Sequence, residues 1–504
     1  MGESLKRHRR TGQMTMKTQS SIKALATGVP GLDEVLGGGI PEFSFNLIAG
    51  DPGSGKTTLA HQIMFALATP ERPALYLTVL GEPPLKMLRY QQQFDFFQSD
   101  AIGLSIHFIN LSDEVLSNDL DHVLGRIVLE VEKYNPSLVF VDSFRSIAQV
   151  STLTDGSSNN LQRFIQQLGM LMTSWQATTF LIGEYSIESE ANPVFTVADG
   201  MICLHQSVQR NSMVRKVEIR KMRGHPSLPG LHTFRISAAG VKVFAPARAL
   251  SLADDVEPQL LAPRALMGVP GLDEMMGGGL PRGYSLLVAG PSGSGKSILA
   301  GAFLAEGARC GEAGVIAAFE QPPQRSRDRV LAGLIAGGQV GVVDSRAADL
   351  SIDEVVGLLL SEVRRLDAKR VVIDSLSGFE MALAPTFRAD FRENLARMVA
   401  ALASVGVTVL MTSELEDRYT DLRFSPYGTA FMTDAIIVQR YMEVESRLLR
   451  MLAVVKVRAS DHSNELREYS IDADGLRIGE MLTGLEGLLG GRPSDAARLR
   501  ELDD

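Results

Sequence analysis

The stretch GDPGSGKT at residues 50–57 decides how this chain folds, and it returns as GPSGSGKS at residues 290–297. Both match the pattern G-x-x-x-x-G-K-[S/T], in which glycines let the backbone turn so that successive N–H groups point at phosphate oxygens. Apolar residues before each loop (45–49 and 286–289) predict a buried strand, and the residues after it open a helix. We therefore predict two phosphate-binding loops, each placed between a strand and a helix.

The pattern also assigns a role to single residues of each loop. The lysine reaches the β- and γ-phosphates of a nucleotide, and the last hydroxyl binds Mg²⁺. We expect ATP to contact Gly50, Gly53, Ser54, Gly55, Lys56, Thr57 and Thr58 in the first loop, and Gly290, Gly293, Ser294, Gly295, Lys296, Ser297 and Ile298 in the second. The alternative is a glycine-rich turn that binds nothing, and two copies in matching context argue against it.

The repetition extends well beyond the loops. GVPGLDE at residues 28–34 recurs at 268–274, and a triple glycine follows each copy at the same displacement of 240 residues. A period of this length indicates duplicated domains. We expect a disordered basic arm over residues 1–23, a first domain over 24–246, a linker over 247–263, a second domain over 264–493 and a tail over 494–504.

A second pair of segments predicts the rest of each site. The apolar runs LVFVD (138–142) and RVVID (370–374) read as buried strands that end in Asp142 and Asp374. Runs of this kind are common, but an acidic residue there holds Mg²⁺ in phosphate-loop ATPases, and its recurrence in both halves favours that role. Further apolar strands (178–182 and 407–411) and a helix opened by the S-x-x-E pattern at 351–354 complete an α/β rhythm. Each domain is predicted to be a mainly parallel, twisted sheet flanked by helices.

Composition excludes several classes of protein. The 504 residues contain 45% hydrophobic residues and only two cysteines, which allows neither a disulfide framework nor a cysteine-based zinc site. We find no apolar run long enough for a membrane span or a signal peptide, so the expected location is the cytoplasm. The formal net charge of −9 argues against a protein that chiefly grips nucleic acid.

Taken together, the G-L-D-E entry, the paired loops, the [VI]-D-S segments and the K-x-R endings at 221–223 and 456–458 resemble the KaiC family of double-domain, RecA-like ATPases. The resemblance covers almost the whole chain. It implies a homo-oligomer, a hexamer of two stacked rings in that family, with ATP and Mg²⁺ bound between neighbouring subunits. It also implies a nucleotide-dependent conformation read by a partner, here an unidentified signalling protein.

The family carries a pair of glutamates after the strand that follows the phosphate-loop helix, and the first is taken to activate the attacking water. By this resemblance the first repeat keeps only Glu82, and the second keeps Glu320 followed by Gln321. We expect the second domain to hydrolyse ATP more normally and the first to be slower or mainly structural. The alternative, in which one glutamate suffices at either site, stays open.

The family's cations that act on the neighbouring subunit match Lys221, Arg223, Lys456 and Arg458. Alternate residues of a strand share a face, so each pair can point the same way; the alternative is a solvated basic strand. Glu184 and Glu414 resemble a polar sensor position, or else they are ordinary solvated strand ends.

The family is typified by a circadian clock component that phosphorylates itself, and the resemblance fails at its phosphorylation sites. The two acceptor positions upstream of Thr433-Asp434 are Ala430 and Phe431, which have no hydroxyl. An autophosphorylating kinase that uses Ser425, Thr429 or Thr433 is therefore an alternative to a simple ATPase. A RecA-like, DNA-dependent ATPase is a third reading, disfavoured because the segments after residues 184 and 414 are acidic or mixed.

Overall fold

The computed structural model describes residues 23–79, 84–116, 119–147, 158–185, 193–209, 212–246, 263–319, 329–343, 349–415, 432–444, 446–473, 475–483, 485–486 and 494–495. These residues fall into two compact units, the first holding those up to Cys203 with 219–229 and 237–240, and the second holding the remainder. No helix in the described part of the chain has the length and apolar character needed to cross a membrane.

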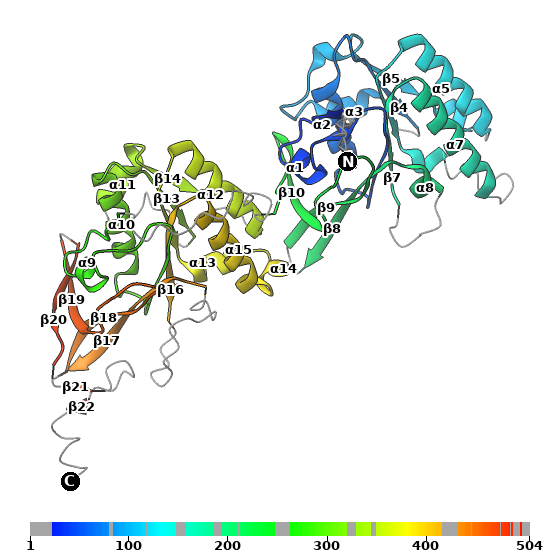
Figure 1. The fold of residues 1–504 in the computed structure, drawn as a ribbon. Coiled ribbons are helices and arrows are strands. Elements are labelled where there is room, and N and C mark those ends of the chain that lie inside the picture. The colour runs from blue at the N-terminus through cyan, green and yellow to red at the C-terminus, as the bar shows by residue number, and fades with distance from the viewer. Residues whose placement is uncertain are drawn as a thin grey trace, which may run out of the picture. The chain divides into compact units, whose positions relative to one another are not determined.

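Each repeat builds a nine-stranded sheet from the described residues (Figure 1). The two sheets have the same strand order when one of the two orders below is taken in reverse. In the first sheet the order is β11-β10-β9-β8-β3-β7-β6-β4-β5, and its strands are β3 (Phe45–Gly50), β4 (Ala74–Thr78), β5 (Ile106–Asn110), β6 (Leu138–Asp142), β7 (Thr178–Gly183), β8 (Gly200–Gln209), β9 (Ser212–Met222), β10 (Leu231–Ser237) and β11 (Gly240–Val243). The second sheet reads β14-β13-β15-β16-β12-β17-β18-β19-β20, with β12 (Ser285–Gly290), β13 (Gly314–Ala318), β14 (Val340–Val343), β15 (Arg370–Asp374), β16 (Thr408–Glu414), β17 (Ala435–Val444), β18 (Arg447–Val457), β19 (Leu466–Asp472) and β20 (Gly475–Met481).

The predicted α/β architecture is confirmed. Strands β4 to β7 and β3 pair in parallel, as do β12 to β17, and the strands expected before the loops and before the two aspartates are β3, β12, β6 and β15. The phosphate-loop strand lies inside the sheet in both repeats. Parallel neighbours bring the carboxyl ends of these strands to one edge, so the loops and the aspartates meet there.

The sequence did not predict the antiparallel half of each sheet. Strand β17 pairs antiparallel with β18, β18 with β19 and β19 with β20, and β9 pairs antiparallel with β10. Lys221 and Lys456 lie near the ends of β9 and β18. These strands therefore carry the K-x-R segments back to the edge where the phosphate-loop strand begins.

Helices precede and connect the parallel strands. In the first repeat they are α1 (Leu32–Leu36), α2 (Lys56–Leu67), α3 (Pro84–Gln91), η1 (Ser99–Ala101), α4 (Ser112–Leu116), α5 (Leu120–Tyr134), α7 (Ser158–Ser174) and α8 (Pro193–Val197). In the second they are α9 (Leu272–Met275), α10 (Lys296–Arg309), α11 (Arg329–Ala336), α12 (Ile352–Leu366), α13 (Leu376–Ala382), α14 (Pro385–Arg388) and α15 (Phe391–Ser404). Two short ribbons, β1–β2 (Ala24–Leu25 with Ile40–Pro41) and β21–β22 (Leu485–Glu486 with Ser494–Asp495), complete the described elements.

Helix α12 begins as its sequence predicts. The Ser351 hydroxyl accepts a hydrogen bond from the backbone N–H of Glu354, and the Glu354 carboxylate accepts one from the backbone N–H of Ser351. This capping box satisfies two N–H groups that a helix start leaves without partners. It fixes where α12 starts and so which of its faces packs on the sheet.

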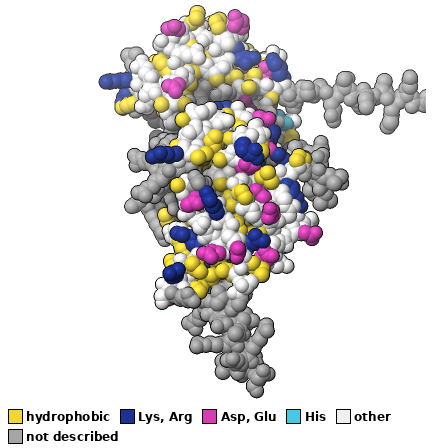
Figure 2. Space-filling view, turned by 90° about the vertical axis from the view of Figure 1, so that its left-hand side faces the viewer, with side chains coloured by type: hydrophobic (Ala, Val, Ile, Leu, Met, Phe, Trp, Pro, Cys, Tyr) yellow, Lys and Arg dark blue, Asp and Glu magenta, His cyan; other side chains and the backbone are white. Residues whose placement is uncertain are grey.

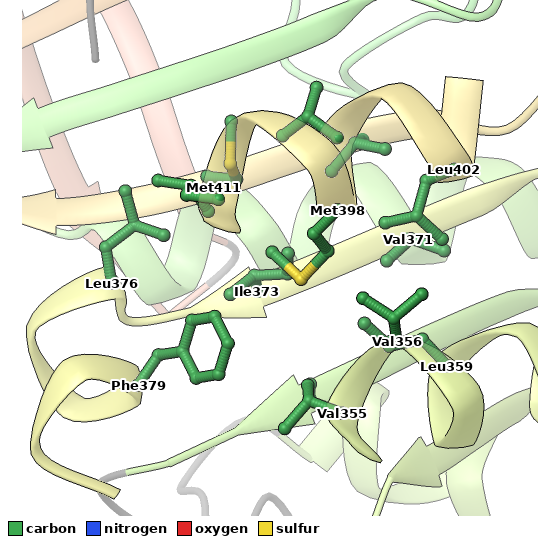
Figure 3. Close-up of a cluster of buried hydrophobic side chains, with 14 of the residues drawn as sticks. Val355, Val356, Leu359, Val371, Ile373, Leu376, Phe379, Met398, Leu402 and Met411 are labelled. Carbon is green, nitrogen blue, oxygen red and sulfur yellow. The ribbon is translucent and has the colours of Figure 1, made fainter. Parts of the chain in front are cut away.

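The second sheet is buried on both faces. Along β12, Leu286 and Val288 belong to one apolar cluster, whereas Leu287 and Ala289 belong to the cluster on the opposite face. In Figure 3 the latter cluster lies between β15, α12 and α15, with Val371 and Ile373 facing those helices. Burial on both faces explains why the parallel strands are continuous apolar runs rather than alternating ones.

An aromatic group behind the first phosphate loop contains a histidine. His61 of α2 is fully buried, and its ring centroid lies 4.7 Å from that of Tyr76, with Phe65 and Phe108 also around it. Neither ring nitrogen lies within ordinary hydrogen-bond geometry of a partner among the described residues, and the nearby Gln91 side chain only partly favours the protonated ring. Burial accordingly lowers the pKa of His61 to about 4.

This histidine makes the chain acid-sensitive. The pKa of His61 is lower in the folded state than in the unfolded state. As the pH decreases from 6.5 to 4, the unfolded chain therefore takes up a proton that the folded chain excludes, and the free energy of unfolding decreases. We expect His61→Phe to reduce that pH-dependent loss by about 3 kcal/mol, measured as denaturation midpoints across this range. His122→Gln, a change at an exposed histidine of α5, is the control and should leave the slope unaltered. Equal slopes in wild type and His61→Phe would contradict the assignment.

Candidate functional site

Both phosphate loops lie where the sequence places them. Each leaves the carboxyl end of its strand, β3 or β12, and leads directly into α2 or α10. Gly55 and Gly295 cap these helices with φ of 103° and 97°, a backbone conformation in which a side chain would be strained. The glycines thus allow the abrupt turn that presents helix N–H groups to an anion.

The loop lysines are held inside their own loops. Lys56 Nζ donates to the carbonyl oxygens of Gly50 (2.9 Å) and Asp51 (2.8 Å), and Lys296 Nζ donates to those of Gly290 (2.8 Å) and Pro291 (2.7 Å). Burial lowers the pKa of Lys56, an effect that the nearby carboxylates of Glu184, Asp142 and Asp51 oppose. The ammonium groups are therefore positioned within the turn that would surround a phosphate.

The first loop contacts the aspartate predicted to lie beside it. Thr57 Oγ1 donates to Asp142 Oδ2 at 2.9 Å. A hydroxyl next to a carboxylate is a set of hard oxygen donors, which suits Mg²⁺ with most of its waters retained. Ser297 and Asp374 hold the matching positions in the second repeat, where Asp374 Oδ1 accepts a hydrogen bond from Thr412 Oγ1.

The two aspartates have different supporting partners. In the first repeat the buried Tyr76 of β4 donates its hydroxyl to Asp142 Oδ2 at 2.8 Å. The matching residue of β13 is Ile316, which has no hydroxyl. Thr412 of β16 donates to Asp374 instead. The hydrogen-bond donor that supports the aspartate therefore comes from a different strand in each repeat.

The second loop is braced by residues that sequence reasoning missed. Ser294 Oγ donates to Gln439 Oε1 at 3.0 Å, and the Tyr469 hydroxyl donates to the Ser294 carbonyl at 2.6 Å. Gln439 lies on β17 and Tyr469 on β19, both in the antiparallel half of the sheet. No local pattern marks these residues, because their roles depend on a sheet pairing that the sequence did not predict.

A cavity of about 790 Å³ adjoins the second loop. Ser297 and Ile298 line it from the start of α10, Arg309 from the end of that helix, Asp472 from the end of β19 and Ala473 from the turn that follows. Its size falls within the range that holds small ligands and cofactors.

The K-x-R residues lie far from the loop of their own domain. Lys221 Nζ donates to the carbonyls of Phe195 and Thr196, both at 3.4 Å, and Lys456 Nζ donates to that of Thr433 at 2.6 Å. Burial lowers the pKa of both lysines, with the adjacent Arg223 or Arg458 adding to the effect. These contacts bring each lysine to the segment that precedes β8 or β17.

Each arginine pairs with an aspartate at the same edge. Arg223 Nη1 lies 3.0 Å from Asp199 Oδ1, and Arg458 Nη1 lies 3.1 Å from Asp434 Oδ1. In both repeats the pair is separated by 24 residues along the chain. That recurring spacing is the signal by which the two aspartates could have been found from sequence.

The aspartates also bind the first residue of the phosphate-loop strand. Asp199 Oδ2 accepts from the backbone N–H of Phe45 at 3.1 Å, and Asp434 Oδ2 accepts from the backbone N–H (3.0 Å) and hydroxyl (2.8 Å) of Ser285. Each arginine is therefore tied to the start of β3 or β12, and each phosphate loop to its end. Five residue steps of strand separate the two, roughly 17 Å.

Several predicted residues lie outside the described part of the chain. They are Glu82, Glu320, Gln321, Ser425, Thr429, Ala430 and Phe431. Thr433 is described, and its side chain is buried, with 0% of the residue exposed. A buried hydroxyl is a poor acceptor for a phosphoryl group.

The fold and the paired loops define the class: tandem RecA-like phosphate-loop domains that bind and hydrolyse a nucleotide. The family model described as "ATPase: KaiC" matches residues 25–248 and again 266–483. The chain belongs to the KaiC family, and it is an ATP-binding ATPase with two such domains.

Relatives of the same family align along almost the entire chain. The circadian clock oscillator protein KaiC of Rippkaea orientalis is 26% identical over 96% of this chain and 94% of its own length. That of Picosynechococcus is 27% identical over 96% of both, and KaiC 1 of Synechocystis is 27% identical over 94% and 93%.

The aspartate that joins arginine and strand should stabilise its domain. Asp434→Ala removes the acceptor of the Ser285 backbone N–H and one partner of the Arg458 guanidinium, and we expect a loss of about 2 kcal/mol in unfolding free energy. Glu443→Ala, at an exposed carboxylate on the same strand β17, should change it by less than about 0.5 kcal/mol. Denaturant unfolding would decide, and equal midpoints for the two variants would show that Asp434 has no such role.

Proposed function

We propose that the chain forms a head-to-tail ring in which the cations of one subunit complete the nucleotide site of the next. The placement of Arg458 carries the proposal. It is held at the start of β12, roughly 17 Å from the loop at the other end, which is more than twice the reach of an arginine side chain. Because this arginine lies at the sheet edge opposite its own phosphate loop, it is placed to contact the loop of another copy instead. Head-to-tail contacts of this kind, repeated from copy to copy, can close into a ring. By resemblance to the family, the ring is a hexamer.

Within each site the loop holds the phosphates of ATP, and Lys56 or Lys296 turns toward the β- and γ-phosphates. Thr57 with Asp142, and Ser297 with Asp374, would hold Mg²⁺, which neutralises charge on the transferred phosphoryl group. Water attacks the γ-phosphorus, the bond to the β–γ bridging oxygen breaks, and ADP and phosphate leave. Glu320 in the second site, or Glu82 in the first, takes the proton from the water. Lys221 and Arg223, or Lys456 and Arg458, come from the neighbour and stabilise the transition state.

The ring is proposed to act as a conformational switch. Ligands that come from two subunits couple the nucleotide state to the contact between them, so hydrolysis in the second domain changes a surface that a partner protein can read. The partner is an unidentified signalling protein. The first domain contributes mainly to assembly.

The alternatives have less support. A self-kinase of the clock type needs an accessible hydroxyl near Thr433, but that residue is buried and Ser425 and Thr429 lie outside the described part of the chain. A DNA-dependent ATPase needs a basic surface. On the face drawn in Figure 2, the Lys and Arg side chains of the described residues are interspersed with Asp and Glu. The net charge of −9 also opposes binding to a phosphate backbone.

Mixing inactive subunits tests the shared site. Lys296→Ala lacks its own loop lysine and Arg458→Ala lacks the cation it lends, so each alone should lose second-site phosphate release. In a 1:1 mixture, about a quarter of the interfaces join an intact Lys296 to an intact Arg458, and phosphate release should recover to that extent.

The control for this experiment is a Lys296→Ala/Arg458→Ala double variant mixed with Arg458→Ala. No interface in that mixture contains both residues, so phosphate release should stay at the baseline set by the first site. Recovery in neither mixture, with rings present, would place Arg458 outside its neighbour's site.

The division of labour is tested by measuring phosphate release and particle size together. We expect Glu320→Gln to abolish most turnover while the ring persists, because it keeps every nucleotide contact but removes the base. Lys56→Ala should mainly break the ring. Unchanged turnover in Glu320→Gln would move the hydrolytic role to Glu82.

A further inference from the structure

An arginine lies at the first phosphate site in addition to the K-x-R residues. Arg145 is the third residue after Asp142, and its Nη1 lies 2.9 Å from Glu184 Oε2. Glu184 directly follows β7, whose Gly183 pairs in parallel with Ala49 of β3. Because parallel pairing continues in step, Glu184 is level with Gly50, the first residue of the phosphate loop. The ion pair therefore lies at the carboxyl edge of the sheet, beside the loop.

Charges around the loop lysine agree with this position. Burial has the largest effect on the pKa of Lys56 and lowers it. Among the carboxylates that raise this pKa, Glu184 has the strongest effect, whereas the charge of Arg145 lowers the pKa further. Both members of the ion pair thus lie near enough to act on the lysine that the motif assigns to the β- and γ-phosphates.

The pair is exposed to solvent. The Arg145 side chain is 48% exposed and that of Glu184 is 37% exposed. Ion pairs of this kind contribute little to stability, because water and salt screen them. The guanidinium can therefore exchange this carboxylate for a phosphate group, a doubly charged anion that accepts the same forked hydrogen bonds.

We propose that Arg145 binds the γ-phosphate of the nucleotide in its own subunit, and that Glu184 holds the guanidinium when the bound nucleotide lacks that phosphate. The inference rests on nucleotide binding at the first loop. It gives the first site a means of distinguishing ATP from ADP that does not depend on the neighbouring subunit.

The second repeat lacks this device. Glu414 pairs with Gly290 and so holds the same place as Glu184, but the third residue after Asp374 is Ser377. A serine there has no charge to offer a phosphate. The γ-phosphate contact of this kind is therefore specific to the first site, and Ser377 supplies a matched control.

The test measures nucleotide affinity in the full chain carrying Lys296→Ala, which leaves the first site as the binding site. A fluorescent ADP and a fluorescent, non-hydrolysable ATP analogue serve as probes. We expect Arg145→Ala to lower the affinity for the ATP analogue roughly 10-fold and the affinity for ADP by less than about 2-fold, because only the ATP analogue carries the γ-phosphate. Glu184→Gln removes the competing carboxylate, so the preference for the ATP analogue over ADP should rise.

Two comparisons separate this effect from others. Ser377→Ala in the Lys56→Ala chain should leave the ATP-to-ADP affinity ratio of the second site unchanged. The Arg145→Ala effect should be the same above and below the protein concentration at which rings form, whereas the effect of Arg223→Ala should appear only in rings. A dependence of the Arg145→Ala effect on assembly would overturn contact within one subunit.

If Arg145→Ala lowers the affinity for both nucleotides equally, or lowers neither, the inference is overturned, while the proposed ATPase function remains intact. If the Lys296→Ala chain binds neither nucleotide, the first loop is not a nucleotide site, and both the inference and the proposed role of that site fail.

Discussion

Each phosphate-loop strand keeps the phosphate loop and the K-x-R arginine of its own domain at opposite ends of the strand. One end of β12 runs into the loop at Gly290, and the other begins at Ser285, which Asp434 ties to Arg458. The strand is stiff and buried on both faces, so the separation between loop and arginine cannot close by local movement. The head-to-tail assembly proposed above, and the nucleotide-dependent contact between its subunits, depend on this separation.

The duplication preserved this frame and changed what surrounds it. Strand order, loop position and the aspartate–arginine pair are the same in both repeats. The residues that support the first aspartate and face the first loop differ from their counterparts: Tyr76 stands where the second repeat has Ile316, and Arg145 where it has Ser377. Backbone geometry is shared by the whole sheet and resists change, whereas single side chains at the loop edge can vary independently. Two sites with one architecture can therefore respond differently to the same nucleotide.

Local patterns predicted what local physics controls. The capping box at Ser351 started α12 where expected, and the apolar runs before Asp142 and Asp374 became β6 and β15. The loop lysines and hydroxyls also lie where the motif places them. The antiparallel strands escaped prediction because their residues mix polar and apolar types, and their pairing joins segments far apart in the chain. Gln439 and Tyr469, which brace the second loop, were missed for that reason.

The sequence by itself determined that the chain has two phosphate-loop domains of one family, because glycine spacing and buried runs act over a few residues and need no partner from elsewhere. Only the tertiary structure decided where the long-range groups meet. It placed Arg223 and Arg458 at the edge opposite their own loops, and it placed Arg145 beside Lys56. Those positions follow from strand order and parallel register, which bring together residues that no sequence interval relates.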